Sequence, residues 1–299
     1  MMTERQTPEY VNVTATLFER EIVPRNRPAI LRGLVAHWPA VQAAKQSAEA
    51  ACAHLKRFDR GTLLESLNAE PSSGGRFFYT DDLRGFNFRK QKESVGAFLD
   101  RLLGAQSMPS SPAMYVQSAP IPMHLPQWDQ ENVNPLLPAG IFPRIWIGNA
   151  VTATTHSDLA DNLACLVAGK RRFTVFPPDQ LRNLYIGPLE FSPAGRPVSM
   201  VDLEQPDLAR YPKFAEALAS AEVAELEPGD AIYIPYYWWH HVRSLEPFNV
   251  LVNYWWNEGA TSEERVSPYE GLMLALLTIR DLPPSQREVW REIFEHYIF

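Results

Sequence analysis

The chain has 299 residues, with 28 basic and 35 acidic side chains and a net charge of −7. This length is ample for one large domain or two smaller ones, and an acidic balance without a basic tract disfavours a nucleic-acid partner. Two cysteines argue against a disulfide framework and favour a cytoplasmic location, and no signal peptide or membrane span is expected.

The first half of the chain mixes strand and helix signals. Short apolar runs bounded by turn residues predict strands at 28–34, 76–80 and 114–117. Helical spacing predicts helices at 41–70 and 93–103, after a helix or an irregular arm in 1–24. The proline-rich segment 118–143 is either a functional loop or a surface wrap over the core.

Strand signals dominate the second half. Apolar runs separated by Pro-Pro, Pro-Gly-Asp and Glu-Pro turns predict strands at 144–148, 162–167, 172–176, 231–234, 240–245 and 249–255. Helices are predicted at 207–221 and, as a pair broken at Leu282-Pro-Pro, within 267–299. This pattern predicts a mainly β protein, an antiparallel barrel or sandwich with flanking helices and a C-terminal helical pair.

A candidate metal site begins at the stretch Thr155-His-Ser-Asp. His156 and Asp158 are two residues apart, so on extended backbone an imidazole and a carboxylate face the same side. A third ligand from a distant strand would complete a two-histidine, one-carboxylate face, which suits non-haem Fe(II). A single His-x-Asp is weak by itself, because many such pairs are surface residues.

The third ligand is expected in the aromatic stretch Ile234-Pro-Tyr-Tyr-Trp-Trp-His-His-Val. Strand alternation places His240 and His241 on opposite faces, so one of them at most reaches a metal inside a barrel. The alternative is that both are structural histidines. The His-x-Asp upstream and the Pro-Gly-Asp turn just before the stretch favour the metal.

Several segments together resemble the JmjC, or cupin-like, Fe(II)/2-oxoglutarate oxygenases, and among them the asparaginyl hydroxylases. The similar segments are the two just described, Gly169-Lys-Arg-Arg-Phe-Thr-Val-Phe-Pro-Pro, Pro228-Gly-Asp-Ala-Ile-Tyr-Ile-Pro, Val252-Asn-Tyr-Trp and Asn26-Arg-Pro-Ala-Ile-Leu-Arg-Gly-Leu. The resemblance covers most of residues 26–256. It implies a double-stranded β-helix, or jelly-roll, in an oxygenase domain of residues 1–266, followed by a helical dimerisation element of residues 267–299.

The resemblance also implies the site residues. His156, Asp158 and His240 would be the iron ligands, and His241 a structural neighbour. The far carboxylate of the co-substrate 2-oxoglutarate would meet Arg171, where the family has lysine; Lys170 is the alternative. The remaining co-substrate positions match Tyr115, Asn162, Asn253, Trp255 and one of Thr152, Thr154 and Thr155, of which we take Thr155.

The expected activity is Fe(II)- and 2-oxoglutarate-dependent hydroxylation of a C–H bond in a protein side chain or a small molecule. Gln117 matches a position near the substrate, and Trp238, Trp239 and Trp255 would keep the site dry. Pro197 and Val198 replace the Arg-Gln pair with which the asparaginyl hydroxylases bind a carboxamide, which puts that substrate in doubt. The alternative is a non-catalytic cupin-like protein that binds a metal or ligand. The apolar C-terminal helices either pack on the barrel or form a dimer interface, as the resemblance implies, and we predict a homodimer.

Overall fold

The computed structural model describes residues 5–257 and 268–299, and the chain divides into two compact units, Met1–Asn257 and Glu258–Phe299. The domain boundary expected between residues 266 and 267 falls on residues outside the described ranges. Each unit is treated separately below.

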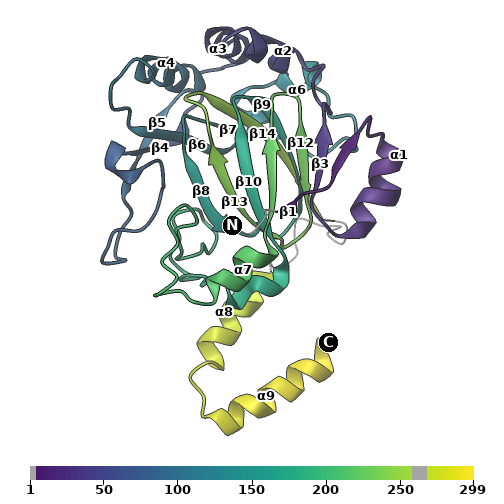
Figure 1. Cartoon of the computed structure of the whole chain (residues 1–299), viewed down its shortest axis with the longest axis vertical. Coiled ribbons are helices and arrows are strands. Elements are labelled where there is room, and N and C mark those ends of the chain that lie inside the picture. Colours follow the sequence, from purple (N-terminus) through teal and green to yellow (C-terminus); the bar gives the residue numbers. More distant parts are fainter. Residues whose placement is uncertain (1–4, 258–267) are drawn as a thin grey trace. The chain divides into compact units, whose positions relative to one another are not determined.

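The first unit is built on two β-sheets (Figure 1). The smaller sheet has the order β1 (Arg5–Gln6), β11 (Glu222–Leu226), β10 (Arg171–Phe176), β13 (Trp239–Ser244), β8 (Thr152–His156). The larger sheet has the order β2 (Glu9–Val11), β3 (Ala29–Arg32), β12 (Ala231–Ile234), β9 (Asp161–Ala168), β14 (Asn249–Trp256), β7 (Arg144–Gly148), β6 (Ala113–Pro120), β4 (Leu64–Ala69), β5 (Phe88–Glu93). All pairings are antiparallel except β1 with β11 and β2 with β3.

The two sheets enclose an apolar core because alternate side chains of each strand point inward. Leu166, Phe173 and Leu251 belong to this inner cluster, whereas their strand neighbours Cys165 and Val252 face the other side of the large sheet. This arrangement confirms the mainly β, cupin-like fold with flanking helices.

Helices cover the outer face of the large sheet (Figure 1). They are α2 (Pro39–Gln46), α3 (Ala48–Lys56) and α4 (Val95–Ala105). Ser47 caps α3 and Ser94 caps α4, each accepting a hydrogen bond from a backbone N–H three residues on. Their apolar faces, which include Val41, Leu55 and Phe98, join the outer faces of β9 and β14 in one buried cluster.

The remaining helices are short. They are α1 (Ala15–Leu17), η1 (Phe18–Ile22), η2 (Val23–Arg25), η3 (Pro71–Ser73), α5 (Ile121–His124), α6 (Trp128–Glu131), η4 (Pro178–Arg182) and α7 (Phe214–Ser220).

Three of the predicted elements are wrong in part. The segment 41–70, predicted as a helix, contains the end of α2, the whole of α3 and, from Leu64 to Ala69, the strand β4. β4 is held as a strand by its pairing with β5 and β6. Residues 76–80 form only isolated bridges. The helix predicted at 207–221 is shortened to α7, because Asp207 and Pro212 favour turns before it.

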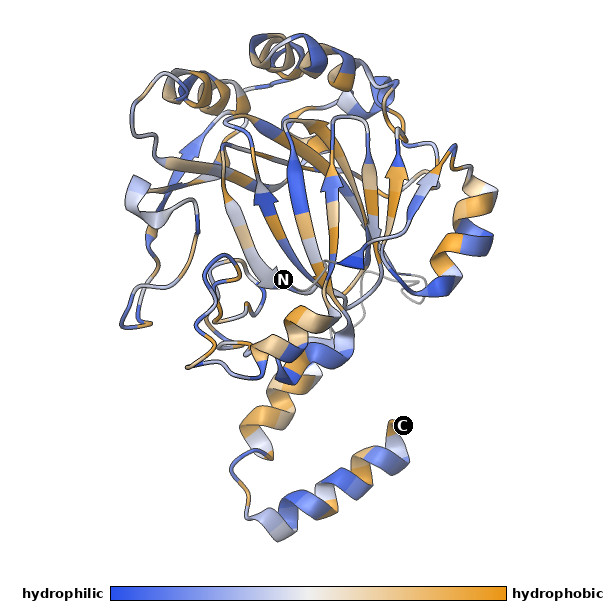
Figure 2. Ribbon diagram, viewed as in Figure 1, coloured by the Kyte–Doolittle hydropathy of each residue, from blue (hydrophilic) through white to orange (hydrophobic). Residues whose placement is uncertain are grey.

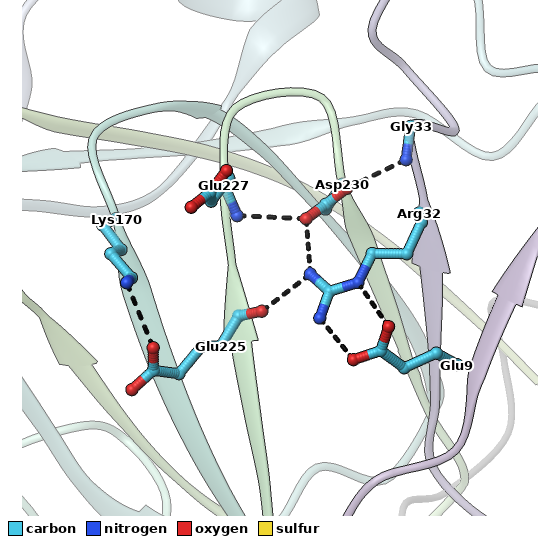
Figure 3. Close-up of polar contacts among 7 residues, drawn as sticks. All are labelled: Glu9, Arg32, Gly33, Lys170, Glu225, Glu227 and Asp230. Atoms are coloured by element: carbon cyan, nitrogen blue, oxygen red, sulfur yellow. Dashed lines mark hydrogen bonds and ion pairs between the residues drawn. The ribbon is translucent and has the colours of Figure 1, made fainter.

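A polar network ties the N-terminal strands to the barrel (Figure 3). Arg32 on β3 donates to a carboxylate oxygen of Asp230 at 2.6 Å and, through Nε, to Glu9 on β2 at 2.9 Å. Asp230 also accepts from the backbone N–H groups of Gly33 and Glu227. The network therefore fixes the Pro-Gly-Asp turn that leads into β12.

The second unit contains the helices α8 (Pro268–Thr278) and α9 (Pro284–Tyr297), separated as predicted by a Pro-Pro break. Figure 2 shows α8 in the colours of apolar residues along most of its length. Leu274 and Leu277 on α8 are 63% and 77% exposed. Within the described ranges, no helix is both long and apolar enough to cross a bilayer.

Candidate active site

Three side chains, from the adjacent strands β8 and β13 and from the residues just after β8, converge inside the barrel. Ligand atoms of His156, Asp158 and His240 all lie within 4.8 Å of one another. His156 is the last residue of β8, and Asp158 follows two residues later. His240 lies on β13 and is the strand partner of His156. Nε2 of His240 lies 3.6 Å from Oδ2 of Asp158, so the two groups face one point. This is the spacing that one metal ion bound by all three would require.

Backbone hydrogen bonds fix how the two imidazoles are presented. Nδ1 of His156 lies 2.8 Å from the carbonyl oxygen of Thr154, and Nδ1 of His240 lies 3.1 Å from that of Trp238. A carbonyl only accepts, so each Nδ1 carries the proton and each Nε2 presents a lone pair. Oδ2 of Asp158 is buried without a hydrogen-bond partner. These are the properties of a prepared cation site, and the residues fit iron.

Burial keeps His240 uncharged. Burial, together with the neighbouring His156, lowers the pKa of His240 from 6.5 to about 4. A neutral imidazole is the form that binds metal.

His241 points away from this cavity, as strand alternation predicts. Its Nδ1 lies 3.5 Å from the hydroxyl of Thr155, and its Nε2 lies 3.6 Å from a carboxylate oxygen of Glu204. His241 therefore packs behind the candidate metal ligands.

A buried cation lies deeper in the same cavity. Arg171 is 2% exposed, and its Nε and Nη2 have no hydrogen-bond partner. It forms no ion pair with any carboxylate in residues 5–257 or 268–299. Burial lowers the pKa of Arg171, yet a guanidinium stays protonated at neutral pH. An unpaired buried cation is costly, which indicates that an anionic ligand belongs there.

The turn between β9 and β10 decides which basic residue points inward. Gly169 has φ +78°, and a Cβ at this position would lie 2.4 Å from the carbonyl oxygen of Phe248. After this turn Lys170 faces outward and pairs with Glu225 at 3.1 Å. Arg171 lines the cavity instead, and Tyr115 lies beside it.

A hydrogen-bonded chain of side chains lines the same cavity. Nε1 of Trp146 donates to Oδ1 of Asn253 at 2.8 Å, and Nδ2 of Asn253 donates to Oδ1 of Asn162 at 3.3 Å. Trp255 completes this wall with its Nε1 buried and unpaired. Tyr115 fits here because its strand partner is Gly148, where a Cβ would come within 2.9 Å of the tyrosine ring.

Some expected residues lie elsewhere. In β8, His156 pairs with His240 but Ala153 pairs with Val242, so the strand bulges by one residue. As a result Ala153 lines the cavity, whereas Thr152, Thr154 and Thr155 do not. Gln117 borders a neighbouring groove, and Trp238 and Trp239 lie outside the cavity lining. Trp146 was not predicted from the sequence as a site residue. Its place two residues before Gly148 on one predicted strand puts both on the same face of the sheet, which was a usable signal.

The paired sheets and the buried triad define a cupin-type barrel with a two-histidine, one-carboxylate metal face. The sequence model of the cupin-like domain family matches residues 15–262 of the chain. The chain therefore belongs to this family, which also includes the JmjC oxygenases.

Individual relatives differ in how much they share with the chain. It is 29% identical over 274 residues to the human bifunctional peptidase and (3S)-lysyl hydroxylase JMJD7, covering 80% of each protein. It is 35% identical over 118 residues to the lysine-specific demethylase JMJ31 of Arabidopsis thaliana, covering 21% of that protein. It is 32% identical over 151 residues to the human tRNA wybutosine-synthesizing protein 5, covering 44% of that protein.

Proposed function

We propose that the protein is an Fe(II)- and 2-oxoglutarate-dependent hydroxylase. The observation that carries this proposal is the joint placement of the metal triad and the unpaired Arg171 guanidinium in one cavity. A metal face alone would suit many cupins. A second, buried cationic site deeper in the barrel is what a chelating dicarboxylate requires.

Each side chain has a distinct task in this proposal. His156, Asp158 and His240 hold iron on one face and leave the others open. Arg171 binds the far carboxylate with the Tyr115 hydroxyl beside it, and a guanidinium can do so through two parallel hydrogen bonds. When bound, iron and 2-oxoglutarate supply the oxidation of a C–H bond by dioxygen. Asn162, Asn253 and Trp255 orient the co-substrate and limit the access of water.

The substrate is a protein side chain or a small molecule. The names of the similar proteins include a lysyl hydroxylase, a lysine demethylase and a tRNA-modifying protein, so family membership does not select among substrates. Pro197 and Val198 are buried and have no side-chain donors, which argues against recognition of an asparagine carboxamide by this segment.

The test is release of succinate from 2-oxoglutarate by the purified protein with Fe(II). We expect succinate release that requires Fe(II) and is lost in Asp158→Ala, whereas Asp179→Asn, a change in the short helix η4 outside the cavity, retains it. Binding of 2-oxoglutarate without succinate release would favour the alternative, a non-catalytic binding protein. A protein that neither binds 2-oxoglutarate nor releases succinate would contradict both the hydroxylase and the binding protein.

Two further properties belong to this proposal. The exposed apolar side chains of α8 and α9 would be covered by a second copy of the chain in a homodimer. The two cysteines are buried and unpaired, which suits the reducing environment of the cytoplasm.

A further inference from the structure

Arg144 is a basic residue on the inner face of the barrel that the proposed chemistry does not use. It is two residues before Trp146 on β7, so both side chains project from the same side of the sheet. Arg144 pairs with Asn253 on β14, and its guanidinium lies 5.6 Å from the ring of Trp255. It is therefore adjacent to two residues that line the metal cavity.

The position of Arg144 is at the end of the barrel away from Arg171. On β10, Arg171 pairs with Ser244, whereas Val175 pairs with His240, so Arg171 lies on the far side of the metal ligands. On β14, Arg144 pairs beside the end of the strand where Trp255 faces Asn162. A substrate that reaches the metal from this end meets Arg144 first.

The guanidinium is held in place without being neutralised. It lies 5.4 Å from the ring centroid of Phe142 and 5.6 Å from that of Trp255, and Nη1 donates to the carbonyl oxygen of Ser118 at 3.1 Å and to its hydroxyl oxygen at 3.4 Å. In the described part of the chain, Nε and Nη2 have no hydrogen-bond partner and no carboxylate forms an ion pair with Arg144. Aromatic contacts and the neutral oxygens of Ser118 orient the arginine while leaving its charge available.

The backbone that holds Arg144 is itself unusual. Ser118 has φ +53°, a conformation disfavoured for a residue with a Cβ, and β6 shifts register between Val116 and Ala119. This irregularity turns the Ser118 carbonyl toward Arg144. Bulges and strained residues of this kind gather where a protein aims a side chain at a ligand.

Space for the rest of a substrate adjoins this position. Ser118 also borders a groove of about 440 Å³ that includes Gln117, Met123 and the loop at Pro193. A ligand whose anionic group meets Arg144 can extend into this groove.

We propose that Arg144 selects a substrate that carries a carboxylate, bound by the Nε and Nη2 of its guanidinium. This inference rests on the proposed function for the location of the reacting end. It deepens that function by naming the chemical class of the substrate: a carboxylate on an acidic polypeptide segment or on a free organic acid.

The experiment compares acids with their amides in the full-length protein loaded with Mn(II) and N-oxalylglycine, a non-reacting analogue of 2-oxoglutarate. One arm uses the acetylated tripeptides Gly-Asp-Gly and Gly-Glu-Gly against Gly-Asn-Gly and Gly-Gln-Gly. The other uses butyrate against butyramide. Ligand-detected NMR gives the ratio of affinities, acid over amide, without any need for turnover.

We expect the acid to bind about 10- to 100-fold more tightly in at least one arm, because hydrogen bonds to charged groups are the strong ones. The ratio falls to near one in Arg144→Gln, is partly retained in Arg144→Lys, and is unchanged in Arg89→Gln, which removes an exposed arginine from β5. A general folding defect would weaken the binding of the acid and of the amide alike. The ratio of their affinities therefore reports only the effect of the Arg144 charge.

A ratio near one in both arms of the wild-type protein would overturn the inference, and so would a ratio that survives in Arg144→Gln. Failure of the proposed hydroxylase function is read separately, as absence of succinate release from 2-oxoglutarate with Fe(II). A preference for the acid in the tripeptide arm would indicate an acidic polypeptide as the substrate, and a preference in the butyrate arm would indicate a free organic acid.

Discussion

His156 and His240 lie opposite each other on adjacent antiparallel strands, with their ring centroids 4.3 Å apart. Both protonated nitrogens are engaged by backbone carbonyls, and both free nitrogens face the side chain of Asp158. Within the described residues, the two imidazoles and the buried carboxylate have no mutual hydrogen bonds that account for this spacing. A bound cation does account for it, and the predictions below follow from that cation and its pocket.

Replacing Arg171 is expected to impair the use of 2-oxoglutarate. Arg171→Gln removes the guanidinium that lines the cavity and is in position to meet the far carboxylate, so KM for 2-oxoglutarate should rise about 10- to 100-fold. Arg171→Lys should restore part of the loss. Steady-state succinate release at varied 2-oxoglutarate measures the effect.

The matched control is the adjacent lysine. Lys170→Gln removes the same charge from the outer face, where Lys170 pairs with Glu225, and should change KM less than about twofold, since exposed pairs contribute little. Equal effects of the two substitutions would show that the co-substrate is not held by Arg171.

Asp230 is expected to stabilise the fold rather than the chemistry. Asp230→Asn weakens the bond to Arg32 and puts an amide among backbone N–H donors, which should lower the free energy of unfolding by about 1–3 kcal/mol. Glu9→Gln, at a carboxylate that is 50% exposed, should cost less than about 1 kcal/mol. Urea denaturation distinguishes them, and equal costs would mean that the network in Figure 3 does not centre on Asp230.

His54 should make the protein sensitive to acid. Burial lowers the pKa of His54 below 6.5, and its Nε2 has no hydrogen-bond partner. The unfolded chain therefore takes up the proton more readily, so this contribution to stability is complete above pH 6.5 and is lost as the pH falls through the folded pKa.

Denaturation midpoints at pH 7.5 and pH 5 measure this effect. His54→Leu should lose less stability between the two values than the wild type, whereas His37→Gln, at an exposed position, should behave as the wild type does. An unchanged pH dependence in His54→Leu would assign the acid sensitivity to other groups.

The C-terminal unit should mediate self-association. Light scattering after size exclusion should give about twice the 34.0 kDa mass of the chain. Leu274→Glu with Leu277→Glu should give a monomer, because both side chains are exposed and apolar, and Gln286→Glu should remain dimeric. A monomeric wild-type protein would refute the dimer.

The sequence allowed much of the fold and the candidate site to be predicted, for identifiable reasons. Apolar runs marked the core strands β7, β9, β10, β12 and β14, because their side chains are buried on both faces of the large sheet or inside the barrel. The exposed strand β5, with the sequence Phe-Arg-Lys-Gln-Lys-Glu, has no such signal. It is held by its pairing with β4, which no local pattern reveals.

The finer placement of site residues depended on tertiary geometry. Alternation separated His240 from His241. The resemblance placed Arg171 in the cavity lining, where the structure also has it, but its choice of Thr155 does not match the lining, because the bulge in β8 brings Ala153 there instead. Arg144 has no motif of its own. Its position follows only from the pairing of β7 with β14 and from the turn at Ser118.

The most direct measurement is anaerobic titration of Fe(II) into the protein with 2-oxoglutarate present, followed by the weak visible charge-transfer band of the chelate. We expect one equivalent of Fe(II) to develop the band in the wild-type protein, and His240→Ala to weaken Fe(II) binding by about 100-fold or more, since even loss of a supporting contact costs about 10- to 100-fold. A wild-type protein that develops no band, or a His240→Ala protein that binds as the wild type does, would contradict an iron site at His156, Asp158 and His240.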